Sequence, residues 1–251
     1  METSPNLVCA WRVGHKLQID YNNIIKERAI ICICWKWQGS DKVYHLTWDK
    51  DQCDKSMLEK FVSELQKADE IIGHNSDKFD EKWIRTRCIY HDIPAMPKYK
   101  SVDTLKIARK GFNFNSNRLN YIGQYLGIGE KIKTEFDLWK RICLKRDNKA
   151  LKAMVEYCKQ DVLLLEGVYD KLQKYAEPST HLAVALGGER WECPHCASEN
   201  VRVSTTKYTK AGIAMTQMMC KECKRYYNVS EKVRRSYAEF RLKEELNKWK
   251  S

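Results

Sequence analysis

Two Cys-x-x-Cys pairs in the last quarter of the chain restrict its fold more than any other feature. Cys193 and Cys196 form the first pair, Cys220 and Cys223 form the second, and 23 residues separate the pairs. Each pair presents two thiolates, so that four sulfurs can surround a zinc ion as a tetrahedron at about 2.3 Å. His195 lies inside the first pair and could compete as a ligand, although four cysteines already satisfy the metal. We therefore predict one structural Zn²⁺ at the four cysteines.

The residues around these pairs suit a small zinc ribbon. Residues 201–203 and the alternating segment 207–218 favour antiparallel strands. A segment of about 35 residues has too little core to fold alone, and metal binding supplies the missing stability. We assign residues 191–229 to the ribbon and residues 230–251 to a basic amphipathic C-terminal helix.

The remaining cysteines occur singly, mostly in apolar segments. They are Cys9, Cys32, Cys34, Cys53, Cys88, Cys143 and Cys158. An odd total without a framework spacing favours reduced thiols over disulfides. The first residues lack the basic and apolar regions of a signal peptide, and the longest apolar run, residues 29–35, is too short to span a bilayer. We expect a cytoplasmic protein without a membrane partner.

The net charge indicates the kind of partner. The chain of 251 residues carries a formal charge of +12 at pH 7. Such a field attracts phosphate backbones and speeds their encounter, so the expected partner is nucleic acid. A basic protein that merely stays soluble is the alternative.

The order of predicted elements indicates a mixed α/β domain in residues 1–176. Strands are expected at 7–13, 29–37, 43–48 and 70–73, with helices at 54–68 and 77–90. From residue 102 onward the pattern looks helical, in segments 104–109, 118–126, 136–144 and 149–175. Strands followed by a strand–helix unit and then by helices are typical of a small sheet with flanking helices. Residues 177–190 are expected to form a linker.

Acidic residues in two of these segments suit metal-dependent chemistry. Tyr157 and Asp161 are four residues apart on a helical stretch, which places the phenol and the carboxylate on one face. Asp80 follows a short strand, at the edge where open α/β sheets place their chemistry. Asp77 is the better candidate for a helix cap there, and Asp103 for the next one. A surface Asp beside a half-buried Tyr is the plain alternative for the helical pair.

Together these motifs resemble a known nuclease family. Asn75-x-x-x-Phe79-Asp80 and Tyr157-x-x-x-Asp161 are similar to the second and third motifs of the DEDD superfamily of 3′–5′ exonucleases, in its DEDDy branch, which includes proofreading domains. The resemblance covers residues 1–175 and implies a ribonuclease H-like fold. The trailing zinc ribbon resembles phage and bacterial members, which implies the host cytoplasm if the protein is phage-encoded.

The first motif of that family is Asp-x-Glu, and here Glu2 matches its glutamate while Met1 takes the variable position. The aspartate would precede Met1, and the resemblance implies a strand there as well, so we expect a sheet without its first strand. A clipped gene model that starts inside Asp-Met-Glu is one account. A natural loss that leaves an inactive nucleic-acid binder is the other.

The resemblance also implies roles for the acids. Two Mg²⁺ or Mn²⁺ ions would serve a two-metal hydrolysis, with Glu2 and Asp161 on one ion and Asp80 completing the other site. Tyr157 would orient the attacking water. Asn75 is either a substrate contact or structural, and His74 is not expected to act as the general base. The expected substrate is single-stranded DNA or RNA, with a replication or repair protein as a further partner.

Basic and aromatic residues supply candidates for gripping a strand. In the ribbon they are Lys207, Arg225 and Tyr227, which suit phosphate contact and base stacking. In the first domain, cationic side chains could line a groove or equally form solvated helix faces: Lys106, Arg109, Lys110, Arg118, Lys131 and Lys133. A structural or protein-docking ribbon, and a catalytically impaired adaptor of the same fold, are the alternatives to a nuclease with a nucleic-acid-binding ribbon.

Overall fold

The computed structural model describes residues 1–12, 14, 18–94, 97–176, 178 and 180–249. The chain divides into two compact units, Met1–Gln173 and Lys174–Ser251, and each is described by itself. None of the described helices is long and apolar enough to cross a membrane.

The first unit is a mixed α/β domain. Its strands are β1 (Glu2–Thr3), β2 (Leu7–Val8), β3 (Ile24–Lys26), β4 (Ile30–Lys36), β5 (Val43–Thr47), β6 (Glu70–Gly73) and β7 (Lys100–Asp103). Its α-helices are α1 (Lys55–Leu65), α2 (Asp80–Tyr90), α3 (Thr104–Gly111), α4 (Leu119–Tyr125), α5 (Phe136–Lys145) and α6 (Asn148–Leu172). Strands β1, β4 and β5 form an antiparallel sheet in that order, β2 pairs with β3, and β6 pairs in parallel with β7.

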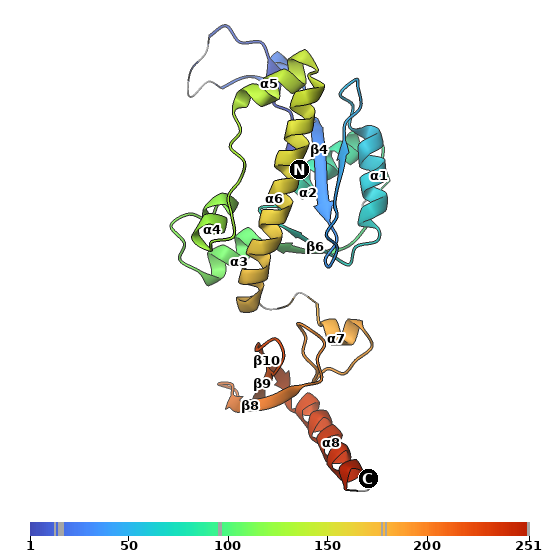
Figure 1. Ribbon diagram of the computed structural model, residues 1–251, viewed down its shortest axis with the longest axis vertical. Helices are drawn as coiled ribbons and strands as arrows, with labels where there is room; N and C mark the ends of the chain where they lie inside the picture. Colours follow the sequence, from blue (N-terminus) through green and yellow to red (C-terminus); the bar gives the residue numbers. More distant parts are fainter. Residues whose placement is uncertain (13, 15–17, 95–96, 177, 179, 250–251) are drawn as a thin grey trace. The chain divides into compact units, whose positions relative to one another are not determined.

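Strand β4 is the centre of the core because both of its faces are covered. Cys32 and Cys34 pack with the residues of α6 on one side, and Ile33 packs with α1 and α2 on the other. This accounts for an apolar run without alternation, which is typical of a strand buried on both faces. Figure 1 shows α6 running alongside the sheet, with α1 on the opposite side of β4.

Close packing of α4 on α6 depends on glycine. A Cβ at Gly123 would lie 2.6 Å from Leu164 Cδ1 and 2.9 Å from the carbonyl oxygen of Gly129. Leu164 is fully surrounded in the cluster that joins α3, α4 and α6. Since Asp161 precedes Leu164 by three residues, the acid and this contact lie on the same face of α6.

Three expectations for local structure need correction. The strand expected at 7–13 is only Leu7–Val8, and Val13 lies outside the described residues. Residues 102 and 103 are not the start of a helical region but belong to β7, where Val102 pairs with Ile72 of β6. The parallel pairing of β7 with β6 involves four residues of each strand, and it overrides the helical pattern of the sequence at residues 102 and 103. The helix expected from 77 begins at Asp80.

The second unit is a three-stranded antiparallel ribbon with a C-terminal helix. Its elements are α7 (Leu182–Ala185), β8 (Val201–Tyr208), β9 (Ala214–Cys220), β10 (Tyr226–Ser230) and α8 (Glu231–Lys248), and the strands are ordered β10-β9-β8. Helix α8 packs Tyr237 and Phe240 against Trp191. The expected helix at 230–251 thus begins one residue later, and 250–251 lie outside the described residues, as do 177 and 179 of the expected linker.

Candidate active site

Helix α6 presents Tyr157 and Asp161 beside the sheet. Asp147 caps the helix, its Oδ1 accepting from the backbone N–H groups of Lys149 and Ala150 at 2.8 and 3.1 Å. The cap fixes where the helix begins, and Met154 and Cys158 then face β4. Tyr157 packs partly against the same cluster, and Asp161 lies one turn further along. The pair expected from the sequence therefore shares a helix face, with both side chains only partly exposed.

Lys131 contacts both members of the pair. Its Nζ lies 2.5 Å from Asp161 Oδ2 and 3.5 Å from the Tyr157 hydroxyl, and 5.4 Å from the centre of the Tyr157 ring. Burial lowers the pKa of Lys131, but the hydrogen bond and charge of Asp161 outweigh it and the net shift is upward. For Asp161, burial raises the pKa, and the hydrogen bond and charge of Lys131 oppose that shift. The 2.5 Å separation fits the charged pair, because a protonated lysine has only donors to offer.

The second oxygen of Asp161 has no hydrogen-bond partner in the part of the chain that the structure describes. Oδ1 is buried and accepts no hydrogen bond from any described residue. An unpaired buried carboxylate oxygen is costly, so a native structure normally satisfies it with a donor, a water or a cation. This oxygen is the feature of the site that best suits a metal ion.

Asp80 and Glu2 come from two other elements of the domain. Asp80 is the first residue of α2, and its Oδ1 is 3.4 Å from the amino nitrogen of Met1. Glu2 is in β1, paired with Cys32 of β4. Burial raises the pKa of Glu2 to about 7; the Met1 ammonium opposes this shift and the charge of Asp161 adds to it. Because Cys32 packs with the residues of α6, the acids from β1 and α6 belong to elements that lie next to β4.

The acids do not form a tight cluster, however. Among the described residues, Glu2, Asp80 and Asp161 are not a group whose ligand atoms all lie within 4.8 Å of one another. Instead, an ammonium group stands next to two of them, Met1 beside Asp80 and Lys131 beside Asp161. Carboxylate oxygens are the ligands that Mg²⁺ prefers, and Oδ1 of Asp161 is open to such an ion while Lys131 holds Oδ2.

The turn after β6 leads to Asp80 and is hydrogen-bonded to β7 and α3. Asn75 has φ of 64°, and its N–H donates to Asp103 Oδ1 at 2.8 Å. Asp103 also caps α3 by accepting from Leu105 N at 3.0 Å, as expected. Asp77 does not cap α2; it accepts instead from Ser101 and Lys106, which ties the turn to β7 and α3. The reason is that the helix starts three residues later, so Asp77 lies before its first turn.

The first unit is similar to known proteins. A family model described as the RNase H superfamily matches residues 26–173, more than half of the chain. The chain belongs to the RNase H superfamily. The matched RNase H region contains Asp80, Tyr157, Asp161 and Lys131. The RNase H-like fold suggests a nuclease that acts on nucleic acid.

Among solved structures, a family B DNA polymerase from the hyperthermophilic archaeon Pyrobaculum calidifontis is similar, with a TM-score of 0.48 and 16% sequence identity. The similar region covers 58% of this chain and 22% of the polymerase chain, so this chain spans less than a quarter of that length. The sequence matches none of the curated proteins compared with it.

The RNase H-like domain is followed by the four-cysteine cluster expected from the sequence. The sulfurs of Cys193, Cys196, Cys220 and Cys223 all lie within 4.8 Å of one another. The Cys193–Cys223 separation is 3.5 Å and the Cys196–Cys220 separation is 3.6 Å. A ZnS₄ tetrahedron with bonds of about 2.3 Å has edges of about 3.8 Å, so the cluster fits zinc. Burial opposes the charged thiolate of Cys220, but backbone N–H groups of Cys223 and Glu222 outweigh it and lower the pKa.

The ribbon residues expected to grip a strand are placed very differently. Lys207 is exposed on β8. Arg225 Nη1 donates to His195 Nδ1 at 2.5 Å, so it is partly engaged within the ribbon. Tyr227 is buried and its hydroxyl donates to the Trp191 carbonyl oxygen at 2.5 Å. Its ring belongs to the ribbon core, so the expected stacking role does not fit its position. The alternation of β10 instead exposes Tyr226.

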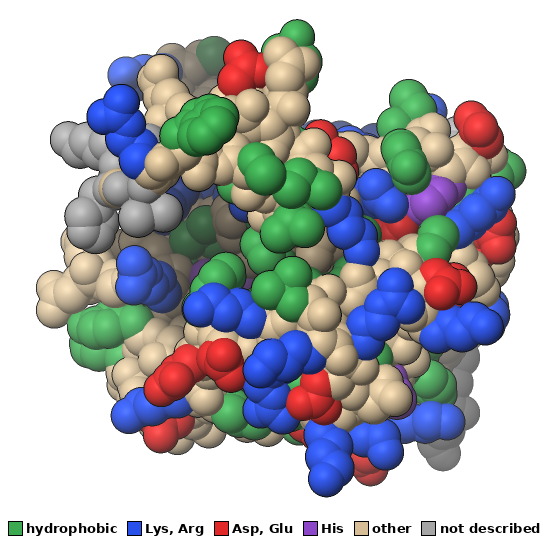
Figure 2. Space-filling view, turned by 90° about the horizontal axis from the view of Figure 1, so that it is seen from above, with side chains coloured by type: hydrophobic (Ala, Val, Ile, Leu, Met, Phe, Trp, Pro, Cys, Tyr) green, Lys and Arg blue, Asp and Glu red, His purple; other side chains and the backbone are tan. Residues whose placement is uncertain are grey.

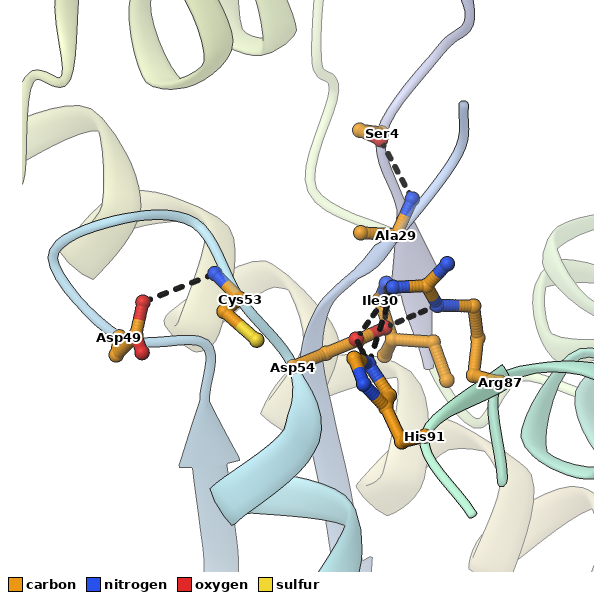
Figure 3. Close-up of polar contacts among 8 residues, drawn as sticks. All are labelled: Ser4, Ala29, Ile30, Asp49, Cys53, Asp54, Arg87 and His91. Carbon is orange, nitrogen blue, oxygen red and sulfur yellow. Dashed lines mark hydrogen bonds and ion pairs between the residues drawn. The ribbon is translucent and has the colours of Figure 1, made fainter. Parts of the chain in front are cut away.

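A second group of metal-type ligands, Cys53, Asp54 and His91, proves to be structural. Figure 3 shows Asp54 surrounded by Arg87, His91 and the backbone of Ile30. Its Oδ1 contacts Arg87 Nη2 at 2.8 Å and His91 Nε2 at 2.6 Å, while Oδ2 accepts from Arg87 Nε and Ile30 N, both at 2.8 Å. Both oxygens of Asp54 are in use, so the group is a buried ion pair that joins α1, α2 and β4.

Sequence reasoning singled out Glu2, Asp80, Tyr157 and Asp161, and missed the particular importance of Lys131. Lys131 lies in the loop between α4 and α5, where no periodic pattern distinguishes it from neighbouring lysines. Lys and Arg side chains are spread over the face shown in Figure 2, with acidic side chains among them, so charge alone does not select one either.

Proposed function

We propose that this protein is a metal-dependent 3′–5′ exonuclease that shortens single-stranded nucleic acid. Membership of the RNase H superfamily supports the nuclease class. The observation that carries the proposal is the pairing of Tyr157 with Asp161, whose buried Oδ1 has no hydrogen-bond partner among the described residues. The free oxygen of Asp161 could hold a metal ion, and the Tyr157 hydroxyl could orient a water bound to that ion.

Two Mg²⁺ or Mn²⁺ ions, when bound, would stabilise the attacking hydroxide and the leaving 3′ oxygen. Glu2 and Asp161 would hold one ion, and Asp80 would help to hold the other. Glu2 has to be ionised for this task. Burial raises its pKa to about 7, and the Met1 and Lys131 ammonium groups only partly oppose this shift, so the ionised form of Glu2 increases as the pH rises above neutral. Burial raises the pKa of Tyr157, so its hydroxyl keeps its proton at neutral pH and can orient a water. Lys131 offsets part of the negative charge of the acids.

The ribbon would add affinity for the strand. One zinc ion at Cys193, Cys196, Cys220 and Cys223 would fix the ribbon, and exposed Lys207, Tyr208 and Tyr226 would contact phosphates and bases. Asn75, at the turn after β6, would contact the strand near the acids. Whether the strand is DNA or RNA is an outcome of the substrate test.

The test is shortening of a 5′-labelled oligonucleotide, as DNA and as RNA, by the full chain with Mg²⁺ or Mn²⁺. Stepwise loss from the 3′ end is expected, and EDTA and Asp161→Ala should both abolish it. Asp170→Ala, a change of an aspartate further along α6, serves as the control and should retain the activity. The same protein with an aspartate placed before Met1 is tested in parallel, because that residue completes the Asp-x-Glu pattern.

A catalytically impaired nucleic-acid-binding adaptor is the second candidate. It is favoured by Lys131, whose ammonium group already pairs with Asp161. If the protein is an adaptor, the chain as given and the chain with the added aspartate should both leave the oligonucleotide intact. Both should still bind it, with an affinity that falls strongly as the salt concentration rises. Unaltered oligonucleotide in every condition would reject the exonuclease.

A further inference from the structure

We propose that His74 is a positioning residue of the candidate active site: it holds the start of α4, and through α4 it holds Lys131 against Asp161. The catalytic part of this inference rests on the proposed exonuclease function. The structural part is independent of that function and has its own readout.

His74 joins three segments that are far apart in the sequence. It directly follows Gly73, the last residue of β6. Its Nδ1 lies 2.9 Å from the hydroxyl oxygen of Thr104, the first residue of α3. Its Nε2 lies 2.9 Å from the carbonyl oxygen of Asn117, two residues before α4. The imidazole therefore bridges the end of β6, the start of α3 and the approach to α4.

Counting hydrogens fixes the role of one of the two ring nitrogens of His74. The Asn117 carbonyl can only accept, so Nε2 must carry the hydrogen. Thr104 has one hydroxyl hydrogen, and its oxygen is also 2.9 Å from the carbonyl oxygen of Gly73. With a neutral imidazole, Thr104 donates either to Nδ1 or to Gly73. His74 is thus a donor to Asn117, and its Nδ1 in the neutral form accepts from Thr104 only in alternation with the Gly73 carbonyl oxygen.

The surroundings favour the neutral imidazole. Burial lowers the pKa of His74; the bond to Asn117 and the charge of Asp103 oppose this shift, while Lys131 and Arg109 add to it. Both ring nitrogens are occupied by these contacts. His74 therefore has no free nitrogen with which to take a proton from water or substrate, and its effect on chemistry has to be indirect.

The indirect path leads to Asp161 through contacts that are each short. Three residues after Asn117, the Asn120 side-chain oxygen accepts from the backbone N–H of Lys131 at 2.7 Å. Lys131 Nζ then reaches Asp161 Oδ2 at 2.5 Å. The other end of α4 is fixed on α6 by the close approach of Gly123 to Leu164. Releasing His74 frees the end of α4 that carries Asn120, and with it the loop that carries Lys131.

The test compares amide hydrogen exchange, residue by residue by NMR, in the full chain and three variants. In His74→Leu the amide of Lys131 should exchange about tenfold faster, as expected for loss of a typical hydrogen bond. His74→Gln keeps a donor for Asn117 and an acceptor for Thr104, and should restore slow exchange. Asn120→Ala should speed exchange at Lys131 while leaving His74 in place. Amides of α1 are the internal reference and should not change.

If His74→Leu does not fold, the comparison of Asn120→Ala with Asn120→Asp, which keeps the acceptor, decides the lower half of the path, and His74→Gln decides the upper half. Unchanged exchange at Lys131 in a folded His74→Leu would overturn the proposal, and so would equal acceleration in His74→Leu and His74→Gln.

An activity arm separates this proposal from the exonuclease function. In a wild type that shortens the oligonucleotide, His74→Leu should lower kcat/KM about tenfold and His74→Gln should recover it. Faster exchange without any change in kcat/KM would reject the positioning role. A wild type that shortens nothing would reject the exonuclease, while the exchange data would still decide whether His74 holds Lys131.

Discussion

Lys131 Nζ lies 2.5 Å from Asp161 Oδ2, although the two are 30 positions apart in the chain. The lysine is the counter-ion of the acid on which the candidate metal site depends. Lysine and a divalent cation would therefore compete for the same carboxylate.

Replacing Lys131 with methionine should strengthen Mn²⁺ binding. The substitution removes the competing ammonium but keeps a long apolar side chain against Tyr157, and an effect of about tenfold corresponds to about 1.4 kcal/mol. Titration of the protein with Mn²⁺, followed by electron paramagnetic resonance, measures it. Lys133→Met, in the same loop and exposed, is the matched control. Weaker Mn²⁺ binding in Lys131→Met would show that the lysine supports the site.

The buried ion pair at Asp54 should make a large contribution to stability. Asp54→Ala leaves Arg87 buried without its partner, which costs about 3–5 kcal/mol. Urea denaturation at pH 7 measures the loss. Asp51→Ala removes an exposed aspartate whose contact with Arg146 is 3.8 Å, so its effect should be under about 1 kcal/mol. Equal losses in the two variants would contradict the structural role of Asp54.

The same pair predicts how stability depends on acid. Burial raises the pKa of Asp54, but the hydrogen bonds of Arg87, Ile30 and His91 outweigh it and the net shift is downward. As the pH falls to the normal pKa of an aspartate, Asp54 therefore takes up a proton in the unfolded chain before it does so in the folded protein. The contribution is complete above the unfolded pKa of about 3.9 and disappears as the pH falls through the lower, folded value. Between pH 5 and pH 2, the wild type should lose more stability than a folded Asp54→Asn variant loses.

Removing zinc should unfold the second unit and spare the first. Its core of Trp191, Val201 and Met218 is small, and metal binding supplies the folding free energy of such domains. Metal analysis should find one zinc per chain, and chelation should collapse the NMR signals of the second unit while those of the first unit stay. Cys220→Ser should reproduce this loss, whereas Cys143→Ser, outside the cluster, should not. Persistence of ribbon signals in metal-free protein would contradict the prediction.

A methyl group at Gly123 should push α4 away from α6. The added Cβ would lie 2.6 Å from Leu164 Cδ1, closer than real contacts allow, and overpacking of this kind costs about 1–3 kcal/mol. Gly111→Ala meets nothing within 4 Å and should change stability by less than about 1 kcal/mol. Thermal unfolding compares the two, and a tolerated Gly123→Ala would place the helices further apart than described.

The sequence was most informative where a residue pattern is local. The i, i+4 spacing of Tyr157 and Asp161 and the two Cys-x-x-Cys pairs are set by helix and knuckle geometry, so short-range rules place them. Strand β7 was missed because its pairing with β6 is decided by a partner about 30 residues away. Lys131 did not stand out because its importance comes from a tertiary contact with Asp161, which no spacing encodes. Tyr227 was misplaced because basic and aromatic composition does not say which ring of a strand faces inward.

The shared face of α6 has a consequence for evolution and engineering of the chain. Asp161 and Leu164 are separated by less than one turn, and Leu164 is locked against Gly123. Inserting a single residue between them would rotate the acid by about 100° relative to that contact and carry it away from Glu2. Insertions should therefore be tolerated in the loops that flank α6. They should not be tolerated within this turn, because the rotation about the helix axis decides in which direction the Asp161 side chain points.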